Sequence, residues 1–363
     1  MTMLDVQNLS VEYKIQGGVL RAVDGVSFTL KRAESLGIVG ESGCGKSTIA
    51  KALLQLLPKN GKISGGHVFF DGDDLVGKSA EEIRKMRQKR IALVSQSAMN
   101  SLNPVHTVGK QIIEAIRCHS RMSVKEAYAR AVEVFSMVGL EEKRLRSFPH
   151  QLSGGMKQRA IIAMALSLEP DIIIADEPTT ALDVVVQGRI LQRIQKIHKE
   201  ISSSMIFITH DISVVSEVCE TIMVMYGGRV MEIADTDSFF RAPYHPYSLG
   251  LQNAFPSITE IGREELVSIP GSPPNLSEPQ EGCRFHVRCP FATETCRIQE
   301  PPLEKVRDDH YSACWYNDKV ESFRREAGKR DTWESVRKRI EEQILREDAH
   351  EEIEHEEIKG AGR

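Results

Sequence analysis

The stretch that decides the fold is Leu36–Thr48, which reads LGIVGESGCGKST. It opens with a short apolar segment, typical of a buried strand, and continues with the G-x-x-x-x-G-K-S spacing of a phosphate-binding loop. Glycines in such a loop let successive backbone N–H groups converge on the phosphates of a nucleotide. The residues expected to bind the nucleotide are Gly40, Ser42, Gly43, Cys44, Gly45, Lys46, Ser47 and Thr48. The stretch therefore predicts a strand, a phosphate loop and a helix within an α/β domain.

Two carboxylates that follow a second apolar strand, Ile172–Ala175, predict hydrolytic chemistry. Because the carboxyl ends of parallel strands meet at one edge of a sheet, Asp176 and Glu177 are expected beside Lys46 and Ser47. Lys46 would contact the β- and γ-phosphates, while Ser47 would bind Mg²⁺ directly and Asp176 through water. Glu177 would activate the attacking water as general base. A surface acidic pair is the alternative, and the phosphate loop in the same chain argues against it.

Three further residues are of interest because of their positions. Gln96 ends the strand-like segment Ile91–Ser95, where its amide would contact both Mg²⁺ and the attacking water. His210 ends the segment Met205–Thr209, where its imidazole would bond the γ-phosphate. Tyr13 follows an early strand-like segment, and its ring is expected to stack on adenine. A lone Gln, His or Tyr is usually structural, so these assignments depend on where the strands end.

A second anion site is predicted at Leu152–Arg159, LSGGMKQR. A Ser-Gly-Gly turn that opens a helix presents bare backbone N–H groups and the positive end of the helix dipole. Ser153, Gly154 and Gly155 are therefore suited to the terminal phosphate of a nucleotide. Two anion sites on one lobe make sense if the second closes onto the nucleotide of a neighbouring molecule. This pattern predicts an ATP-driven clamp that works as a pair.

Length and charge limit the classes of protein. With 363 residues the chain has room for roughly two domains. A formal net charge of −4 and a pI near 6.3 give no sign of a nucleic-acid binder. No segment approaches the ~20 apolar residues of a membrane span, and the N-terminus lacks the features of a signal peptide. We expect a cytosolic chain, so that any membrane it serves is spanned by other chains.

Changes in composition along the sequence divide the chain into three parts. Residues 1–240 alternate strand-like and helical segments, which predicts an α/β domain around a mostly parallel sheet, with a helical subdomain inserted at about 100–165. Residues 241–318 form a Pro-rich, Cys-containing extension, and residues 319–363 form a charged helical tail. The apolar residues of the tail that recur at helical spacing are Trp333, Val336, Ile340 and Ile344. This stripe is expected to pack on the extension or on a partner, with a solvated helix as the alternative.

Four of the seven cysteines are gathered in the extension: Cys283, Cys289, Cys296 and Cys314. Three interpretations are open. Four thiolates can hold an iron–sulfur cluster. They can also hold structural zinc, although no tight C-x₂₋₄-C pair is present. Finally, they can be free thiols or disulfides, and disulfides are disfavoured in a reducing cytosol.

Residues 1–240 resemble an ABC-type ATPase, because they contain its series of motifs. In order, these are Tyr13, Gly40–Thr48, Gln96, Leu152–Arg159, Asp176-Glu177, Ala181-Leu182-Asp183 and His210. The resemblance implies a head-to-tail dimer. The Ser-Gly-Gly turn of one subunit would face the γ-phosphate bound by Lys46 of the other, with Asp183 at the seam. Gln96 would also sense the membrane partner. ATP binding would close the dimer, and hydrolysis would reopen it.

A narrower group is indicated by five segments: Ser101-Leu102-Asn103-Pro104, Met156, 178–184, His245-Pro246-Tyr247 and 282–315. They resemble the D-type ATPase subunit of dipeptide/oligopeptide importers, whereas the tail lies outside the pattern. The group implies a paralogous F-type ATPase partner, two integral-membrane permease subunits and an extracytoplasmic solute-binding protein. It places the chain at the cytoplasmic face of the cell membrane. It also implies a [4Fe–4S] cluster at the four cysteines, with zinc as the alternative, and peptides as cargo, with oligosaccharides or nickel as alternatives.

Other classes of ATPase fit the sequence less well. Chromosome and DNA-repair ATPases of this type separate the two anion sites by a long coiled coil, whereas Lys46 and Ser153 are only 107 positions apart, with no heptad run between them. The acidic charge also argues against DNA. A translation factor with two ATPase heads would carry two signature turns, and one is present. A binding module without catalysis would not need Glu177 and His210.

Overall fold

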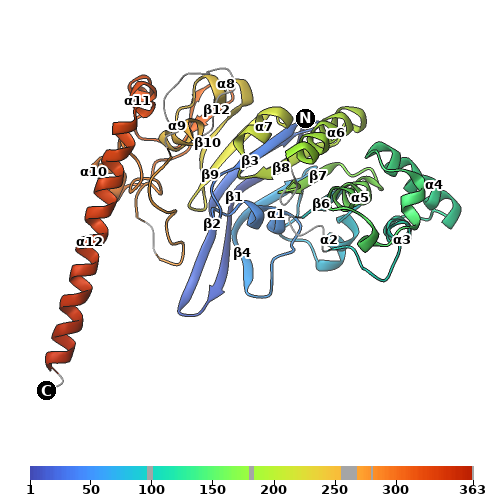
Figure 1. Ribbon diagram of the computed structural model, residues 1–363, viewed down its shortest axis with the longest axis horizontal. Coiled ribbons are helices and arrows are strands. Elements are labelled where there is room, and N and C mark those ends of the chain that lie inside the picture. The colour runs from blue at the N-terminus through green and yellow to red at the C-terminus, as the bar shows by residue number, and fades with distance from the viewer. Residues whose placement is uncertain (96–100, 180–183, 255–267, 279–280, 362–363) are drawn as a thin grey trace. The chain divides into compact units, whose positions relative to one another are not determined.

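The computed structural model describes residues 1–95, 101–179, 184–254, 268–278 and 281–361. The chain forms two compact units, Met1–Val230 and Met231–Arg363 (Figure 1). Residues 231–240, assigned to the ATPase domain from the sequence, belong by compactness to the second unit. Within the described ranges, every helix is too short or too polar to span a lipid bilayer.

A parallel sheet forms the centre of the first unit. Its strand order is β9-β3-β8-β7-β6, with bounds β3 (Ser35–Val39), β6 (Ile91–Val94), β7 (Ile172–Asp176), β8 (Ser204–Thr209) and β9 (Thr221–Tyr226). Neighbouring strands pair in parallel and are almost wholly buried, which explains their continuous apolar sequences. The four strands predicted from the sequence are confirmed, with ends shifted by at most one residue.

An antiparallel sheet also belongs to this unit, with order β2-β1-β4-β5. Its strands are β1 (Thr2–Ile15), β2 (Gly18–Lys31), β4 (Gly61–Phe70) and β5 (Asp73–Asp74). The sequence indicated only the early segment that lies within β1. The β1–β2 register shifts at several points, which interrupts the alternation of apolar and polar residues that reveals a strand.

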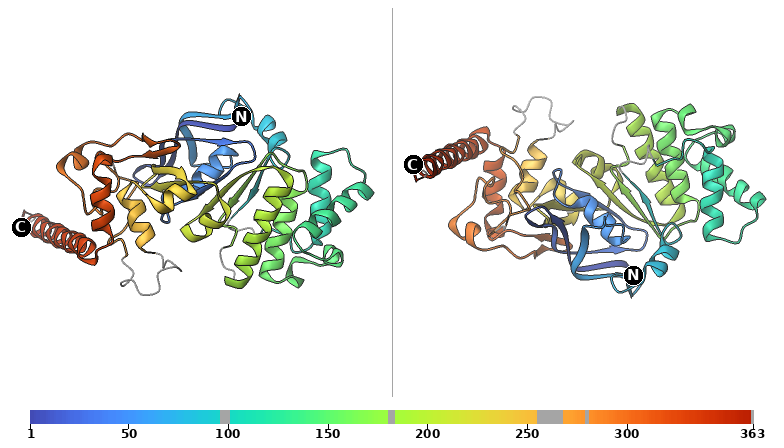
Figure 2. Two further views of the ribbon diagram at one scale, coloured as in Figure 1. Left: turned by 90° about the horizontal axis from the view of Figure 1, so that it is seen from above. Right: turned by 90° about the horizontal axis from the view of Figure 1, so that it is seen from below.

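Helices complete the first unit. Those that alternate with the parallel strands are α1 (Lys46–Leu53), α2 (Ala80–Met86), α6 (Val184–Ile201) and α7 (Ile212–Val218). A helical group lies between β6 and β7 in the sequence and comprises α3 (Val108–His119), α4 (Val124–Met137), the 3₁₀ turns η2 (Glu142–Arg146) and η3 (Pro149–Gln151), and α5 (Gly154–Leu166) (Figure 2). Arg130 of α4 donates to the carbonyls of Leu166 and Ser167 at 3.2 and 3.1 Å, so it caps the end of α5.

The second unit combines a small sheet with short helices and a long terminal helix. The sheet has the order β11-β12-β10, with β10 (Arg229–Asp235), β11 (Glu304–Arg307) and β12 (His310–Ser312). The helices are α8 (Thr236–Arg241), α9 (Pro246–Asn253), α10 (Glu294–Ile298), η4 (Asn317–Lys319), α11 (Val320–Ala327) and α12 (Arg330–Ala361).

The predicted apolar stripe of the tail lies on α12. Trp333 and Val336 are buried, whereas Ile344 is half exposed. Residues 341–345 are all exposed. The first part of the stripe therefore packs within the second unit, and the packing does not extend to Ile344.

Candidate functional site

The phosphate loop joins β3 to α1, and its shape requires glycine. Gly40, Gly43 and Gly45 have φ of 148°, 83° and 101°, values that other residues rarely adopt. A Cβ on Gly40 would lie 2.1 Å from the carbonyl oxygen of Met225, and one on Gly45 would lie 2.3 Å from that of Ala22. The loop is thus fixed closely against neighbouring backbone.

Lys46 is the buried cation of this loop. Its Nζ donates to the carbonyl oxygens of Gly40 and Glu41 at 2.7 and 2.9 Å, and the residue is only 5% exposed. These bonds compensate for the burial of the charge and direct the ammonium group into the curve of the loop. Burial also raises the pKa of the neighbouring Cys44 thiol, so that side chain stays protonated.

The predicted magnesium ligands lie together. The Ser47 hydroxyl at the start of α1 donates to Oδ1 of Asp176 at the end of β7, at 2.9 Å. Burial raises the pKa of Asp176, and this hydrogen bond opposes the shift. Among the described residues, no three His, Cys, Asp or Glu side chains form a group that could hold a metal ion. Magnesium in nucleotide sites takes most of its ligands from phosphates and water, so one hydroxyl and one carboxylate fit it.

Glu177 lies beside His210 at the next strand end. Its Oε1 is 3.2 Å from Nδ1 of His210, which follows β8. The backbone of Glu177 has a φ of 47°, and its N–H donates to the Ile208 carbonyl at 2.8 Å. A left-handed conformation is strained for glutamate, and strain of this kind gathers at functional sites. The geometry therefore places a carboxylate and an imidazole side by side at the edge of the sheet that carries the phosphate loop.

Tyr13 lies next to the helix that follows the phosphate loop. Its hydroxyl is 3.3 Å from Oγ1 of Thr48, the third residue of α1. A Cβ on Gly61 would lie 2.7 Å from the Tyr13 ring, so close contact with a glycine helps to fix the ring. The ring thus lies next to the end of the phosphate loop, and its stacking on adenine remains a prediction.

The Ser-Gly-Gly turn opens α5 as the sequence predicts. Ser153 is the N-cap residue, and its Oγ accepts a hydrogen bond from the Met156 N–H at 3.4 Å. A Cβ on Gly155 would lie 2.6 Å from Cγ1 of Val186 on α6, so the two helices approach closely there. Gly154 forms the first turn with Gly155. Gln96 and Asp183, the remaining predicted site residues, lie outside the described residues.

These features define a class. A parallel sheet carries the phosphate loop on β3, a magnesium-compatible Ser47–Asp176 pair, and a Glu177–His210 pair on the neighbouring strands. A separate helical group presents a Ser-Gly-Gly helix start. The fold and the site are those of a P-loop ATPase of the ABC type.

Comparisons with known proteins agree with this class. The sequence profile of the ABC transporter family matches residues 23–180, and the profile of the oligopeptide/dipeptide transporter C-terminal region matches residues 231–296. The chain is 46% identical over 321 residues to the probable peptide ABC transporter ATP-binding protein y4tR of Sinorhizobium fredii, covering 88% of this chain and 96% of that protein. It is 45% identical to the oligopeptide transport ATP-binding protein OppD of Bacillus subtilis, covering 86% and 88% of the two chains.

A solved structure supports the same conclusion. The dimeric, post-hydrolysis ATP-binding cassette MJ0796 bound to ADP and Pi matches with a TM-score of 0.59 and 33% identity, over 64% of this chain and 99% of that one. The chain belongs to the ABC transporter ATP-binding proteins of the oligopeptide/dipeptide group, and it hydrolyses ATP.

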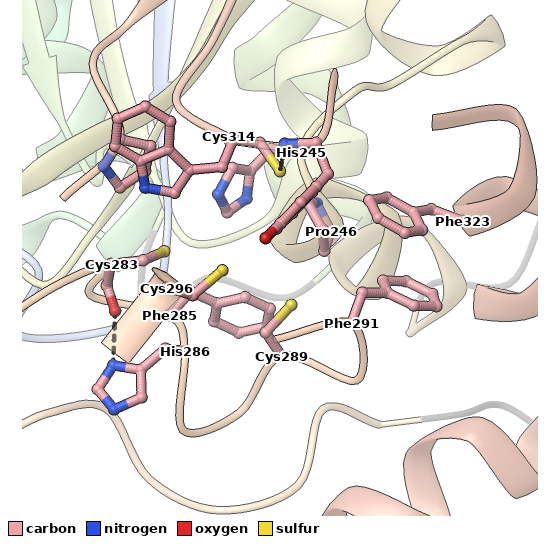
Figure 3. A pocket seen from close by; sticks show the side chains of 13 residues that line it. His245, Pro246, Cys283, Phe285, His286, Cys289, Phe291, Cys296, Cys314 and Phe323 are labelled. Atoms are coloured by element: carbon pink, nitrogen blue, oxygen red, sulfur yellow. Dashed lines mark hydrogen bonds between the residues drawn. The ribbon is translucent and has the colours of Figure 1, made fainter. Parts of the chain in front are cut away.

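A pocket lined by cysteines lies within the second unit. The side chains of Cys283, Cys289, Cys296 and Cys314 line one pocket and direct their sulfurs into it (Figure 3). Burial raises the pKa of Cys283 to about 12 and that of Cys314 to about 11, and raises the pKa of Cys289 well above its usual value. These three thiols are therefore protonated at neutral pH unless a cation stabilises the thiolates.

The walls of this pocket depend on a buried carboxylate that sequence reasoning missed. Glu232 on β10 is fully buried and accepts hydrogen bonds from the backbone N–H groups of Tyr244 and His245 at 2.8 and 2.9 Å. Its Oε1 is also 2.7 Å from Nε2 of His310. His245 lines the pocket, and β12 leads from His310 toward Cys314. The sequence signal for this network is a glutamate at the centre of an apolar run, Val230 to Ala234, within β10.

Proposed function

We propose that this chain is the ATP-hydrolysing subunit of an importer for dipeptides or oligopeptides. The observation that carries the proposal is the combination, in one chain, of the Ser47–Asp176 and Glu177–His210 pairs with an extension that matches the oligopeptide/dipeptide C-terminal region. The names of the relatives, peptide and oligopeptide transport proteins, favour peptides over the alternatives of oligosaccharides and nickel.

The chain's own residues divide the work of hydrolysis. Lys46 would bind the β- and γ-phosphates, and Ser47 directly and Asp176 through water would hold Mg²⁺, which neutralises phosphate charge when bound. Glu177 accepts a proton from the attacking water, and His210, in contact with Glu177, bonds the γ-phosphate. Gln96 would contact the metal and the water, and the Tyr13 ring would stack on adenine.

The functional parts follow the sequence divisions. Residues 1–240 are the ATPase domain, with the helical subdomain at about 100–165, although their last ten residues, 231–240, pack with the second unit; the extension at 241–318 and the tail at 319–363 follow. The partner at the nucleotide is a second ABC ATPase, a paralogous F-type chain. Ser153, Gly154, Gly155 and Asp183 complete the partner's ATP site. The dimeric state of MJ0796 supports such pairing.

The complex lies at the cytoplasmic face of the cell membrane, where the chain is peripheral. Two integral-membrane permease subunits form the path for the peptide, and an extracytoplasmic binding protein delivers it. Affinity purification of the tagged chain from gently solubilised membranes tests this assembly. We expect two integral-membrane proteins and a second ABC ATPase to co-purify. Recovery of DNA or of no membrane protein would refute it.

For the four cysteines we propose a [4Fe–4S] cluster with a structural or regulatory role. Structural zinc sites commonly contain a tight C-x₂₋₄-C pair, and none is present among these four cysteines. Three buried thiols and the half-buried thiol of Cys314 line a common pocket, and four cysteines are the donor set of an iron–sulfur cluster, which would stabilise their thiolates. Zinc is the alternative metal at these four cysteines.

The cluster is tested by its colour and iron content. Anaerobically purified protein is expected to be brown, with absorbance near about 400 nm and about four iron atoms per chain. Cys289→Ser should remove most of both signals, because one of four ligands is lost. Cys118→Ser, a change at an exposed cysteine of the other unit, should leave both signals intact. Colourless protein with one zinc per chain would contradict the proposal.

A further inference from the structure

The first helix of the tail packs on the wall of the cysteine pocket. Phe323 of α11 lines the pocket and stacks on Phe291, with ring centroids 4.1 Å apart and an interplanar angle of 11° (Figure 3). Arg324 of the same helix donates to the carbonyls of Ala242 and Pro243 at 2.8 and 3.0 Å. An aromatic stack and two charged hydrogen bonds therefore attach α11 to the extension.

The second tail helix continues this attachment. Trp333 of α12 is buried, and its Nε1 donates to the Ala327 carbonyl at 2.8 Å. A Cβ on Gly271 would lie 2.9 Å from Cδ1 of Ile340, so α12 packs closely on the loop that contains this glycine. The same Cβ would lie 3.8 Å from Cγ of Arg288, so this loop links α12 to the segment that carries the cysteines.

Arg339 of α12 contacts the cysteine loop directly. Its Nη2 donates to the carbonyl oxygens of Val287 and Cys289, both at 2.9 Å. Arg288, between these two residues, is only 3% exposed and donates from Nε to the Pro270 carbonyl at 2.8 Å. The loop is thus fixed by two guanidinium groups, one of its own and one from the tail. Hydrogen bonds from a charged donor are about twice as strong as neutral ones.

We infer that the tail keeps the four-cysteine pocket closed and that Arg339 is the positioning residue for Cys289. The functional role of this attachment rests on the proposed [4Fe–4S] cluster, whereas the hydrogen bonds and packing that form the attachment do not. Without the guanidinium, the carbonyls of Val287 and Cys289 lose their charged donor and the loop opens more often. Cys289 is then reached by solvent, and a bound cluster loses this ligand more readily.

Cysteine alkylation in the full-length chain tests the inference. Arg339→Met keeps the aliphatic stem but removes the donors, and Arg339→Lys restores a single charged group. Arg337→Met, at an exposed position on the same helix, is the matched control. The rate at which iodoacetamide labels each cysteine is measured by mass spectrometry, on reduced protein before and after bound metal is removed with a chelator. Circular dichroism establishes that each variant is folded.

In chelator-treated Arg339→Met we expect Cys289 to be labelled about tenfold faster, because the closed state of the loop loses its charged hydrogen bonds. Arg339→Lys should show a smaller increase, whereas Arg337→Met should match the parent. Cys283, whose N–H donates to the Cys296 carbonyl at 2.7 Å, should keep its parental rate in all three variants. In protein that carries the cluster, the absorbance near 400 nm should decay faster under chelator in Arg339→Met.

The two readouts separate this inference from the cluster itself. An unchanged labelling rate at Cys289 would overturn the role of Arg339, whether or not the protein binds iron. Faster labelling in protein that never binds iron would support the role of Arg339 and refute the cluster instead. If Arg339→Met does not fold, Arg339→Lys is compared with the parent instead. A labelling rate of Cys289 in chelator-treated Arg339→Lys that equals the parental rate would then overturn the inference.

Discussion

Replacing Glu177 by glutamine should lower steady-state ATP turnover by about 10²- to 10⁴-fold while leaving ATP binding unchanged. Glutamine has nearly the same shape as glutamate, so the strained backbone and the contact with His210 can persist. It cannot accept the proton of the attacking water, and the chemical step is therefore lost. Because reopening of the pair depends on hydrolysis, the variant should accumulate as a closed, ATP-bound dimer. Phosphate release, nucleotide binding and light scattering measure the three quantities.

Glu169→Gln is the matched control. Glu169 shares the left-handed backbone, with a φ of 51°, but its exposed carboxylate pairs with Arg130 on α4. This change should leave turnover within about twofold, since a surface ion pair stabilises the fold by less than ~1 kcal/mol. If Glu177→Gln released phosphate at the parental rate, the assignment of the general base would be wrong.

Replacing Lys46 by alanine should abolish turnover by weakening ATP binding at least about 100-fold. A hydrogen bond to a charged group is worth about 1.5–3 kcal/mol, and the ammonium group is expected to contact two phosphates. The fold should lose only a small part of its stability, because the bonds removed are those from Nζ to Gly40 and Glu41. Binding of a fluorescent ATP analogue to protein shown to be folded gives the affinity.

An exposed lysine of the same unit provides the comparison. Lys59→Ala also removes one positive charge, at a position outside the phosphate loop. Its ATP affinity should stay at the parental value. Equal losses in the two variants would mean that the general charge of the chain, rather than Lys46, attracts the nucleotide. Undiminished binding in Lys46→Ala would place the phosphates elsewhere.

Sequence patterns predict the parts of this protein in which local chemistry decides the structure. A phosphate loop needs glycines at positive φ and close backbone approach, so Gly40 and Gly45 are identifiable before any coordinates. Parallel strands buried on both faces have continuous apolar sequences, so β3, β7 and β8 are visible with nearly correct ends. Asp176 and Glu177 come directly after the apolar residues of β7, so the sequence identifies them as well.

The remaining features depend on contacts between distant residues. Glu232 and His310 are 78 positions apart, and Arg339 and Cys289 are 50 apart, so no spacing rule connects either pair. The antiparallel sheet escapes prediction for another reason, since its register shifts disturb the alternation of side chains. The tail contains one feature that the sequence predicts and one that it does not. Its helical stripe is predictable, whereas the surface on which Trp333 packs is not.

The central claim is that each ATP is hydrolysed between two ATPase subunits. The most direct measurement is ATP turnover per chain, first for the purified chain over a range of concentrations and then for the chain assembled with its ATPase partner and membrane subunits. We predict low turnover for the dilute chain, a rise as subunits pair, and the full rate in the assembly. A full rate for the dilute chain alone, independent of concentration and partners, would contradict the claim.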